Sequence, residues 1–304
     1  MIFYSEFDDF DAWKTALGSQ GIELRRSEDI GNPADVRSAL VWKPPHGFFQ
    51  TFQNLELVVN LGAGVDALVD RPDLPNVPIT RLSDPRMARM MAGFVLFAVT
   101  RYARNIPEFE KAQRDRRWHY IHPKDPADIT VGVLGLGELG LEAAGECSRQ
   151  GYRVLGWSRT PKDVEGIASS TGEEGLTAVL SQSDIVVCML PKTPDTDNML
   201  DADKLRLMKR GAFFINVSRG SVVDEPALIE ALQSGRLGGA TLDVFAKEPL
   251  SKDSALWGME NVLITPHLAS IALPSSAAKQ IAENLRRIGR NEAVLSRIDP
   301  RRGY

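Results

Sequence analysis

Three glycines near the middle of the chain have the spacing of a loop that binds phosphate groups. The segment Thr130–Gly140 reads TVGVLGLGELG, with Gly135, Gly137 and Gly140 between an apolar run and an amphipathic helical pattern. The first glycine allows a tight turn, the second lets backbone approach a pyrophosphate, and the third lets the helix pack closely on the strand. Because strand, loop and helix follow at the required distances, the segment predicts a dinucleotide site.

The end of the next predicted strand indicates which dinucleotide binds. Sites that prefer NAD usually place Asp or Glu there, about 20 residues after the loop, to bond the ribose hydroxyls. Here residues 156–160 read GWSRT, and the first acid is Asp163. Arg159 can pair with a 2′-phosphate that a carboxylate would repel, and Ser158 and Thr160 can donate hydroxyl groups to it. We therefore expect NADPH to be preferred over NADH; the alternative is that Arg159 is an ordinary surface arginine.

Three further polar residues follow predicted strands in the second half of the chain. Arg219 follows the run FFINVS, Glu248 lies shortly after TLDVF, and His267 follows ITP. With a nicotinamide bound, reduction of a 2-oxo acid needs a cation for the carboxylate and carbonyl, a proton donor, and a group that tunes the donor. Open α/β sheets place ligands at the carboxyl ends of strands. These residues are therefore catalytic candidates, although any one alone is more often a solvated side chain or a cap.

The predicted elements alternate between strands and helices in two series. The first series favours a parallel sheet, with strands expected at Ile2–Tyr4, Ile22–Leu24, Ala39–Trp42, Leu57–Asn60 and Val77–Thr80. Six strands in the second series are typical of a doubly wound nucleotide-binding sheet, at Ile129–Leu134, Arg153–Trp157, Ile185–Leu190, Ala212–Val217, Gly239–Asp243 and Val262–Thr265. A long helical segment runs between the two series, from Asp84 to about Trp118.

We therefore predict an α/β protein with two doubly wound domains. A flavodoxin-like substrate domain is expected to comprise residues 1–95 and 271–304, completed by a helix over residues 274–295. A Rossmann-type NADP-binding domain, residues 96–270, is inserted between these two parts. Closure of a cleft between the domains is expected to accompany binding.

The composition excludes several classes of protein. The chain has 304 residues, of which 43% are hydrophobic and 25% charged, so it can bury a core and is not predicted to be disordered. The formal net charge of −4 argues against a broad surface for nucleic acid. Neither a membrane span nor a metal-ligand spacing is found, and two cysteines do not make a disulfide framework. We expect a cytoplasmic protein with no metal, nucleic acid or membrane partner.

Several segments together resemble the D-isomer-specific 2-hydroxyacid dehydrogenase family. The matching segments are GLGELG (135–140), LPKTPDTDNML (190–200), INVSRGSVVDEPALIEALQSGRLGGATLDVFAKEPL (215–250) and TPHLAS (265–270). Further segments are most similar to the glyoxylate/hydroxypyruvate reductase A type of that family, namely VWKPP (41–45), LGAGVD (61–66), WSRT (157–160) and the terminal RGY. The resemblance implies reduction of glyoxylate or hydroxypyruvate, and a homodimer.

The resemblance also implies roles for single residues. Arg219 would grip the substrate carboxylate and 2-oxo group, His267 would donate a proton to the carbonyl oxygen, and Glu248 would pair with His267 and favour its charged form. Ala63 and Gly64 would present backbone N–H groups to the substrate carboxylate, and Trp42 would wall the pocket unless it is a core residue. Beside the glycines and residues 158–160, implied cofactor contacts are Leu136, Glu138, Leu139, Pro191, Thr193, Thr196, Val217, Ser218 and Asp243.

Two alternatives stay open after these arguments. A bulkier 2-oxo acid would need a larger pocket, whose walls come from the more loosely matched first domain. A dinucleotide-sensing protein without turnover would keep the glycine loop but would not need the three catalytic candidates.

Overall fold

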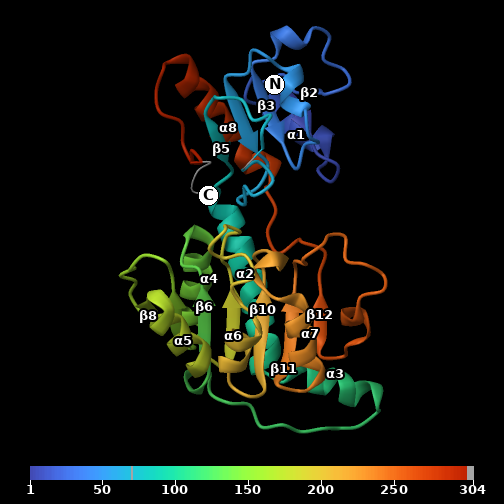
Figure 1. The fold of residues 1–304 in the computed structure, drawn as a ribbon, viewed down its shortest axis with the longest axis vertical. Helices are drawn as coiled ribbons and strands as arrows, with labels where there is room; N and C mark the ends of the chain where they lie inside the picture. The colour runs from blue at the N-terminus through green and yellow to red at the C-terminus, as the bar shows by residue number, and fades with distance from the viewer. Residues whose placement is uncertain (70, 300–304) are drawn as a thin grey trace. The chain divides into compact units, whose positions relative to one another are not determined.

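The computed structural model describes residues 1–69 and 71–299, so the terminal RGY segment lies outside the described residues. The chain forms two compact units, each with its own parallel sheet (Figure 1). Unit 1 comprises Met1–Met87 with the chain from Ile271 onward, and unit 2 comprises Ala88–Ser270. The first change of unit falls inside helix α2 (Pro85–Ala103), and the boundary predicted at residues 95 and 96 lies further along the same helix.

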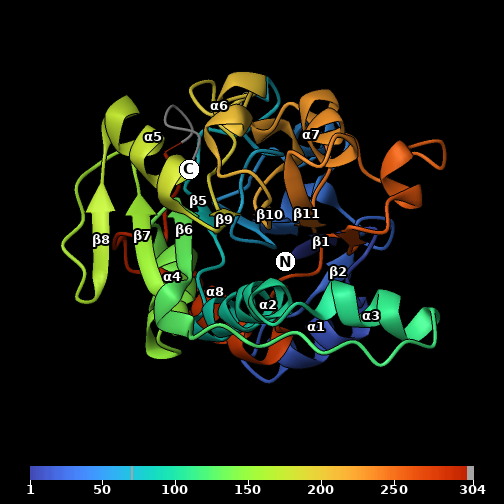
Figure 2. The ribbon, with the colours of Figure 1, turned by 90° about the horizontal axis from the view of Figure 1, so that it is seen from below.

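Unit 2 has a seven-stranded parallel sheet in the order β12-β11-β10-β9-β6-β7-β8 (Figure 2). Its strands are β6 (Thr130–Leu134), β7 (Arg153–Trp157), β8 (Ile167–Ser170), β9 (Ile185–Cys188), β10 (Ala212–Asn216), β11 (Leu237–Leu242) and β12 (Val262–Ile264). From β6 the strand order first proceeds to one edge of the sheet, through β7 and β8, and then continues from β9 toward the other edge. The position between β6 and β9 is therefore a topological switch point, where doubly wound sheets bind ligands. The predicted α/β class with a Rossmann-type domain is confirmed.

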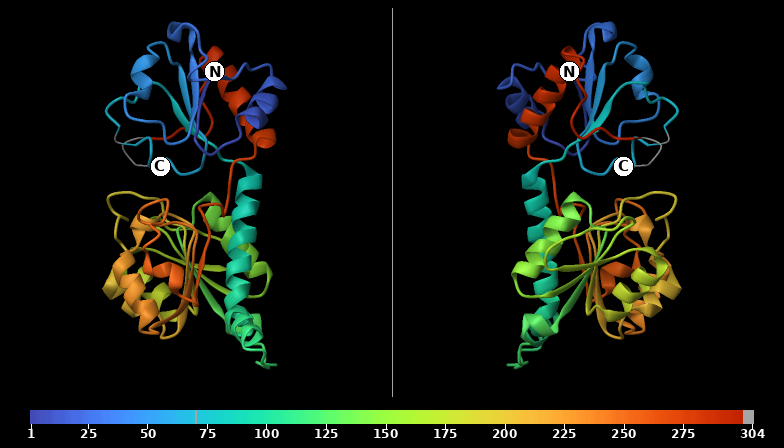
Figure 3. Two further views of the ribbon diagram at one scale, coloured as in Figure 1. Left: turned by 90° about the vertical axis from the view of Figure 1, so that its right-hand side faces the viewer. Right: turned by 90° about the vertical axis from the view of Figure 1, so that its left-hand side faces the viewer.

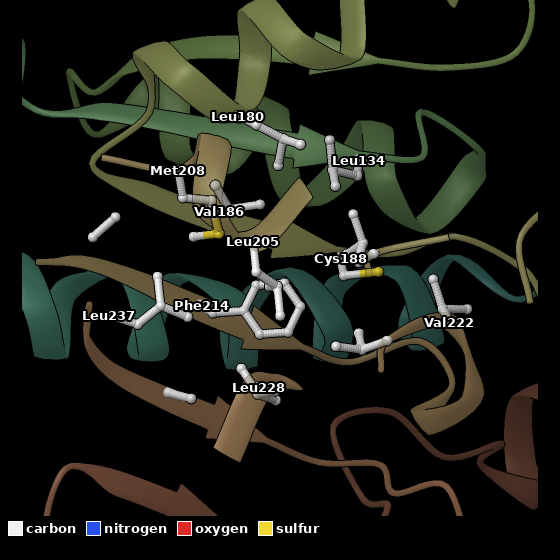
Figure 4. Close-up of a cluster of buried hydrophobic side chains, with 14 of the residues drawn as sticks. Leu134, Leu180, Val186, Cys188, Leu205, Met208, Phe214, Val222, Leu228 and Leu237 are labelled. Atoms are coloured by element: carbon white, nitrogen blue, oxygen red, sulfur yellow. The ribbon is translucent and has the colours of Figure 1, made fainter. Parts of the chain in front are cut away.

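Helices cover both faces of this sheet and enclose two cores. On one face lie α2 and α4 (Glu138–Arg149); on the other lie α5 (Gly172–Gln182), α6 (Ala202–Leu207) and α7 (Glu225–Gln233) (Figure 3). Neighbouring residues of β10 point to opposite faces, as a pleated strand requires. Phe214 lies in the core under α5 to α7, shown in Figure 4, and Ile215 lies in the core under α2 and α4.

Unit 1 has a five-stranded parallel sheet in the order β2-β1-β3-β4-β5, which is the flavodoxin-like order. Its strands are β1 (Ile2–Tyr4), β2 (Arg25–Arg26), β3 (Ser38–Val41), β4 (Leu57–Asn60) and β5 (Ile79–Arg81). Helix α8 (Pro274–Gly289) packs beside α1 (Phe10–Gly18), where Ile281 shares a core with Trp13 and Leu17. The last helix therefore belongs to unit 1, and it ends at Gly289 rather than at residue 295.

Several elements differ from the sequence prediction, three of them for a clear physical reason. Strand β8 was not expected, because its sequence IASS buries only Ile167 and so lacks the apolar pattern of an inner strand. The helical segment predicted to about Trp118 divides into α2 and α3 (Ile106–Arg114), because Asn105 takes a left-handed conformation with φ of 53°. Strand β2 follows the predicted run Ile22–Leu24, since Leu24 is buried in the core while the two arginines pair with β1.

Candidate active site and cofactor site

The glycine loop between β6 and α4 has the close approaches that its spacing predicts. A Cβ on Gly140 would lie 1.9 Å from the carbonyl oxygen of Gly135, and a Cβ on Gly135, whose φ is 102°, would lie 2.7 Å from the carbonyl oxygen of Met189. A Cβ on Gly137 would meet no atom within 4 Å, and Gly137 caps α4 without a side-chain hydrogen bond. The space beside Gly137, at the start of α4, is therefore open, which fits a pyrophosphate bound at a helix N-terminus. Leu136 is buried and Glu138 is exposed.

The turn after β7 presents Arg159 and Thr160 at the surface, while Ser158 is buried. The Ser158 hydroxyl donates to the carbonyl oxygen of Thr160 at 2.7 Å, and its backbone N–H donates to Ser170. Ser158 thus braces the turn, and its hydroxyl proton is used within it. The groups of this turn that are exposed for a 2′-phosphate are Arg159 and Thr160, and the structure has no carboxylate within the turn 158–160.

A second turn follows β9 and contains three of the predicted cofactor contacts. The Thr196 hydroxyl donates to the carbonyl oxygen of Pro191 at 2.6 Å and accepts from the backbone N–H of Thr193 at 2.8 Å. Thr196 therefore fixes the shape of the turn, and Pro191 is exposed on it.

The turn that carries Arg219 is organised by Asn216, a residue that the sequence did not single out. Asn216 is buried at the end of β10; its Oδ1 accepts from the N–H and the hydroxyl of Ser218 at 3.1 and 2.8 Å, and its Nδ2 donates to the carbonyl oxygen of Arg219 at 3.1 Å. Gly220 lies so close to the chain after β11 that a Cβ would be 1.8 Å from the carbonyl carbon of Phe245. The Arg219 turn thus packs directly against the segment that leads to Glu248.

Glu248 and His267 form a hydrogen-bonded pair. Nδ1 of His267 lies 2.9 and 3.1 Å from the two carboxylate oxygens of Glu248, with the side chains 28% and 24% exposed. Nδ1–H therefore donates to the carboxylate, which directs the exchangeable proton to Nε2. His267 has a φ of 54°, a conformation that costs free energy for a residue with a Cβ and that clusters at functional sites.

Asp243 holds the loop that carries His267. Its Oδ1 accepts from the Thr265 hydroxyl at 2.6 Å and from the N–H of Leu268 at 2.9 Å, and its Oδ2 accepts from the N–H of Ala269 at 2.9 Å. The side chain is buried, and its carbonyl oxygen accepts from the His267 N–H at 2.8 Å. Both carboxylate oxygens therefore hold the His267 loop, a role that the sequence alone did not indicate for Asp243.

The candidate substrate residues of unit 1 lie together after β3 and β4. The Trp42 ring packs on Gly62, where a Cβ would be 2.6 Å from Cζ3 of the indole. Nδ2 of the buried Asn60 donates to the carbonyl oxygens of Gly62 and Gly64, each at 2.8 Å. Because a trans peptide directs its C=O and N–H oppositely, the N–H groups that follow these carbonyls point away from Asn60. One of them belongs to Ala63, as anion binding by this loop requires.

The two cysteines have structural roles in unit 2. Burial raises the pKa of the Cys147 thiol to about 12 and also raises the pKa of Cys188, whose sulfur lies 3.3 Å from the Ser218 hydroxyl. Among the described residues no group of three metal-binding side chains occurs, and no helix is long and apolar enough to cross a membrane.

Comparison with known proteins finds relatives that match unit 2 or the whole chain. The model of the D-isomer specific 2-hydroxyacid dehydrogenase family, NAD binding domain, matches residues 96–269. Glyoxylate/hydroxypyruvate reductase A of Serratia proteamaculans is 35% identical over 311 residues, which cover 100% of this chain and 99% of that protein.

Two solved structures are similar over the same length. A D-isomer specific 2-hydroxyacid dehydrogenase from Xanthobacter autotrophicus Py2, in complex with NADPH and MES, is 59% identical with a TM-score of 0.96, covering 100% of this chain and 98% of that chain. The NADPH-dependent glyoxylate/hydroxypyruvate reductase of Sinorhizobium meliloti, in complex with NADP and sulfate, is 31% identical with a TM-score of 0.93, covering 100% and 99%. The chain therefore belongs to the D-isomer specific 2-hydroxyacid dehydrogenase family, as its sequence predicts.

Proposed function

We propose that this protein reduces small 2-oxo acids with NADPH, converting glyoxylate to glycolate and hydroxypyruvate to D-glycerate. The observation that carries the proposal is the Glu248–His267 pair, positioned after strands β11 and β12 of a dinucleotide-binding sheet and next to the Arg219 turn. The relatives from Serratia and Sinorhizobium, whose names state glyoxylate and hydroxypyruvate reduction, support the substrate class.

The proposed mechanism assigns one task to each of three side chains. The planar guanidinium of Arg219 holds the substrate carboxylate and polarises the 2-oxo group. His267 donates the proton on Nε2 to the carbonyl oxygen while that carbon is reduced, and Glu248 keeps the imidazole oriented through Nδ1 and stabilises its charged form. The nicotinamide, when bound, supplies the hydride.

The dinucleotide would be held by groups that are exposed around the glycine loop. The N–H groups at the start of α4 fit the pyrophosphate, and Arg159 with Thr160 fits a 2′-phosphate. The relatives solved with NADPH or NADP support this preference. A cytoplasmic location is part of the same proposal, because a chain whose two cysteines lie in separate buried cores has no disulfide framework that needs an oxidising compartment.

A homodimer belongs to the same proposal. An apolar groove of about 360 Å³ runs along α2 and α3, between Leu96, Phe97 and Ile106, and Phe97 is half exposed. Trp118, after α3, is fully exposed. An exposed apolar groove of this kind is typical of a surface that a partner subunit covers.

A spectrophotometric assay tests the proposed function. Purified protein is mixed with NADPH or NADH and a panel from glyoxylate and hydroxypyruvate to pyruvate and phenylpyruvate. We expect the fastest oxidation with NADPH and the two smallest acids. Faster turnover of phenylpyruvate would instead assign a bulkier substrate, and tight NADPH binding without turnover would favour a sensor.

A further inference from the structure

A buried ion pair in unit 1 lies outside the candidate residues. Nε and Nη2 of Arg71 donate to the two carboxylate oxygens of Asp73 at 2.9 and 2.7 Å, with the side chains 6% and 2% exposed. Two parallel charge-assisted bonds fix the orientation of both groups as well as their separation. Such a pair repays its desolvation only when the remaining polar atoms are also bonded.

Those remaining atoms bond to a different loop. Nη1 and Nη2 of Arg71 donate to the carbonyl oxygens of Pro44 and Pro45, the second at 2.6 Å, and Oδ2 of Asp73 accepts from the N–H of Gly47 at 2.8 Å. The guanidinium carbon also lies 5.2 Å from the ring centroid of Phe49. The loop after β4 thereby binds the loop after β3 through three hydrogen bonds, across 26 or 27 residues of sequence.

The two joined loops carry the candidate substrate residues of unit 1. Trp42 lies two residues before Pro44 and packs on Gly62, while Ala63 and Gly64 precede Arg71 and Asp73 in the segment between β4 and β5. Neither loop is an element of regular structure at these residues. The position of the Trp42 ring over the anion-binding loop therefore depends on contacts between the loops.

The backbone conformation of Lys43 shows where the chain needs support from the hydrogen bonds of Arg71. Lys43, between Trp42 and Pro44, has a φ of 44°, which residues with a Cβ rarely adopt and which persists only where surrounding contacts impose it. The arginine bonds to the next two carbonyl oxygens along the chain. The hydrogen bonds from Arg71 thus begin directly after the strained Lys43. The ion pair therefore holds the backbone segment that determines the orientation of Trp42.

We propose that Arg71 and Asp73 are positioning residues that hold Trp42 and the 62–64 loop in the arrangement that receives the carboxylate of the 2-oxo acid. This inference rests on the proposed function. Neither side chain needs to touch the substrate, because both act through the backbone of residues 44–47. Loss of the pair is expected to weaken substrate binding and to leave the dinucleotide site of unit 2 unchanged.

The test compares Arg71→Lys and Asp73→Asn with the wild type. Lysine keeps the charge and loses the planar fork, so Arg71→Lys also serves if Asp73→Asn does not fold. We expect KM for glyoxylate to rise about tenfold in both variants, with kcat and KM for NADPH changed by less than about twofold. Glu56→Gln is the matched control, because Glu56 forms an exposed 3.7 Å ion pair with Arg37 in the same unit.

Hydrogen exchange of peptides covering residues 42–52 gives a readout that does not depend on turnover. We expect faster exchange there in both variants than in the wild type, and an unchanged exchange rate in the control. Faster exchange with unchanged KM would show that the pair only stabilises the fold, and unchanged exchange would show that it does not hold the loop; either result overturns the inference. A wild type without turnover would instead overturn the proposed function, and this inference with it.

Discussion

At the residue scale, the account depends most on His267 and the carboxylate that orients it. Glu248 accepts from Nδ1 of His267 at 2.9 Å. We expect His267→Ala to lower kcat about 10²- to 10⁴-fold, because general acid catalysis contributes that much. Glu248→Gln should lower kcat about tenfold, since a neutral amide accepts a weaker hydrogen bond from Nδ1–H than a carboxylate does and orients the ring less firmly.

The control for both changes is Glu260→Gln, which removes an exposed carboxylate whose 3.7 Å contact with Arg114 contributes little. Steady-state kinetics with glyoxylate and a fluorescence titration of NADPH make the comparison. Near-normal turnover of His267→Ala would assign the proton donor to another group.

Arg159 is the residue that decides the cofactor preference. Arg159→Asp replaces a cation with a carboxylate that repels a 2′-phosphate, so kcat/KM for NADPH should fall at least about 30-fold relative to NADH, about 2 kcal/mol. Arg153→Asp is the matched control, because it makes the same charge change at the other end of β7, where Arg153 is exposed. An unchanged ratio in Arg159→Asp would contradict the phosphate assignment.

Asp73 makes the stability of unit 1 depend on pH. Hydrogen bonds from Arg71 hold the pKa of this carboxyl below its usual range, against the opposing effect of burial. The stabilisation is therefore fully present above the pKa of the unfolded chain, about 3.9, and is lost as pH falls toward the lower folded pKa. We expect Asp73→Asn to unfold at a lower temperature than the wild type at about pH 6, and the difference to shrink at about pH 3. A difference independent of pH would contradict this account.

At the element scale, the turns after strands hold the reactive groups through buried side chains. Asn216 bonds both Ser218 and the carbonyl oxygen of Arg219. Asn216→Ala should destabilise the fold by about 1–3 kcal/mol and raise KM for the 2-oxo acid, because the turn loses its internal bonds. Asn216→Asp keeps the acceptor and should restore part of the loss. Equal kinetics in both variants and the wild type would show that the turn holds Arg219 without Asn216.

The sequence predicted those elements that are determined by residues close to one another in the chain. The glycine loop could be predicted because its constraints are local: Gly135 has a φ of 102°, and a Cβ on Gly140 would lie 1.9 Å from the carbonyl oxygen of Gly135. The roles of Asp243 and Arg71 could not, because the groups that they hold lie 22 to 27 residues away in the sequence and become neighbours only when strands align or loops meet. Asn216 bonds residues only two and three positions further along, so an amide at the end of a buried strand was a local signal for its role. Strand β8 was not predicted for a similar reason. The strand Ile167–Ser170 forms because it pairs with β7, and its own residues are mostly polar.

At the scale of the whole molecule, unit 1 is formed by two segments, one from each end of the chain. Unit 2 is inserted between these segments in the sequence. The apolar groove on α2 and α3 lies in unit 2, so association through it needs no change in unit 1. Phe97→Asp should shift the protein from dimer to monomer in sedimentation velocity, because a charge replaces an apolar contact. Phe7→Asp, at an exposed phenylalanine of unit 1, is the control. A wild type that sediments as a monomer would contradict the dimer.

The most direct test of the central claim is the product formed from hydroxypyruvate. Purified protein is incubated with hydroxypyruvate and limiting NADPH, and glycerate is separated by chiral chromatography while NADPH is followed by absorbance. Arg219, Glu248 and His267, acting as proposed, give one D-glycerate for each NADPH oxidised, and His267→Ala gives almost none. Bound NADPH that is not consumed, or glycerate of the L configuration, would contradict the account.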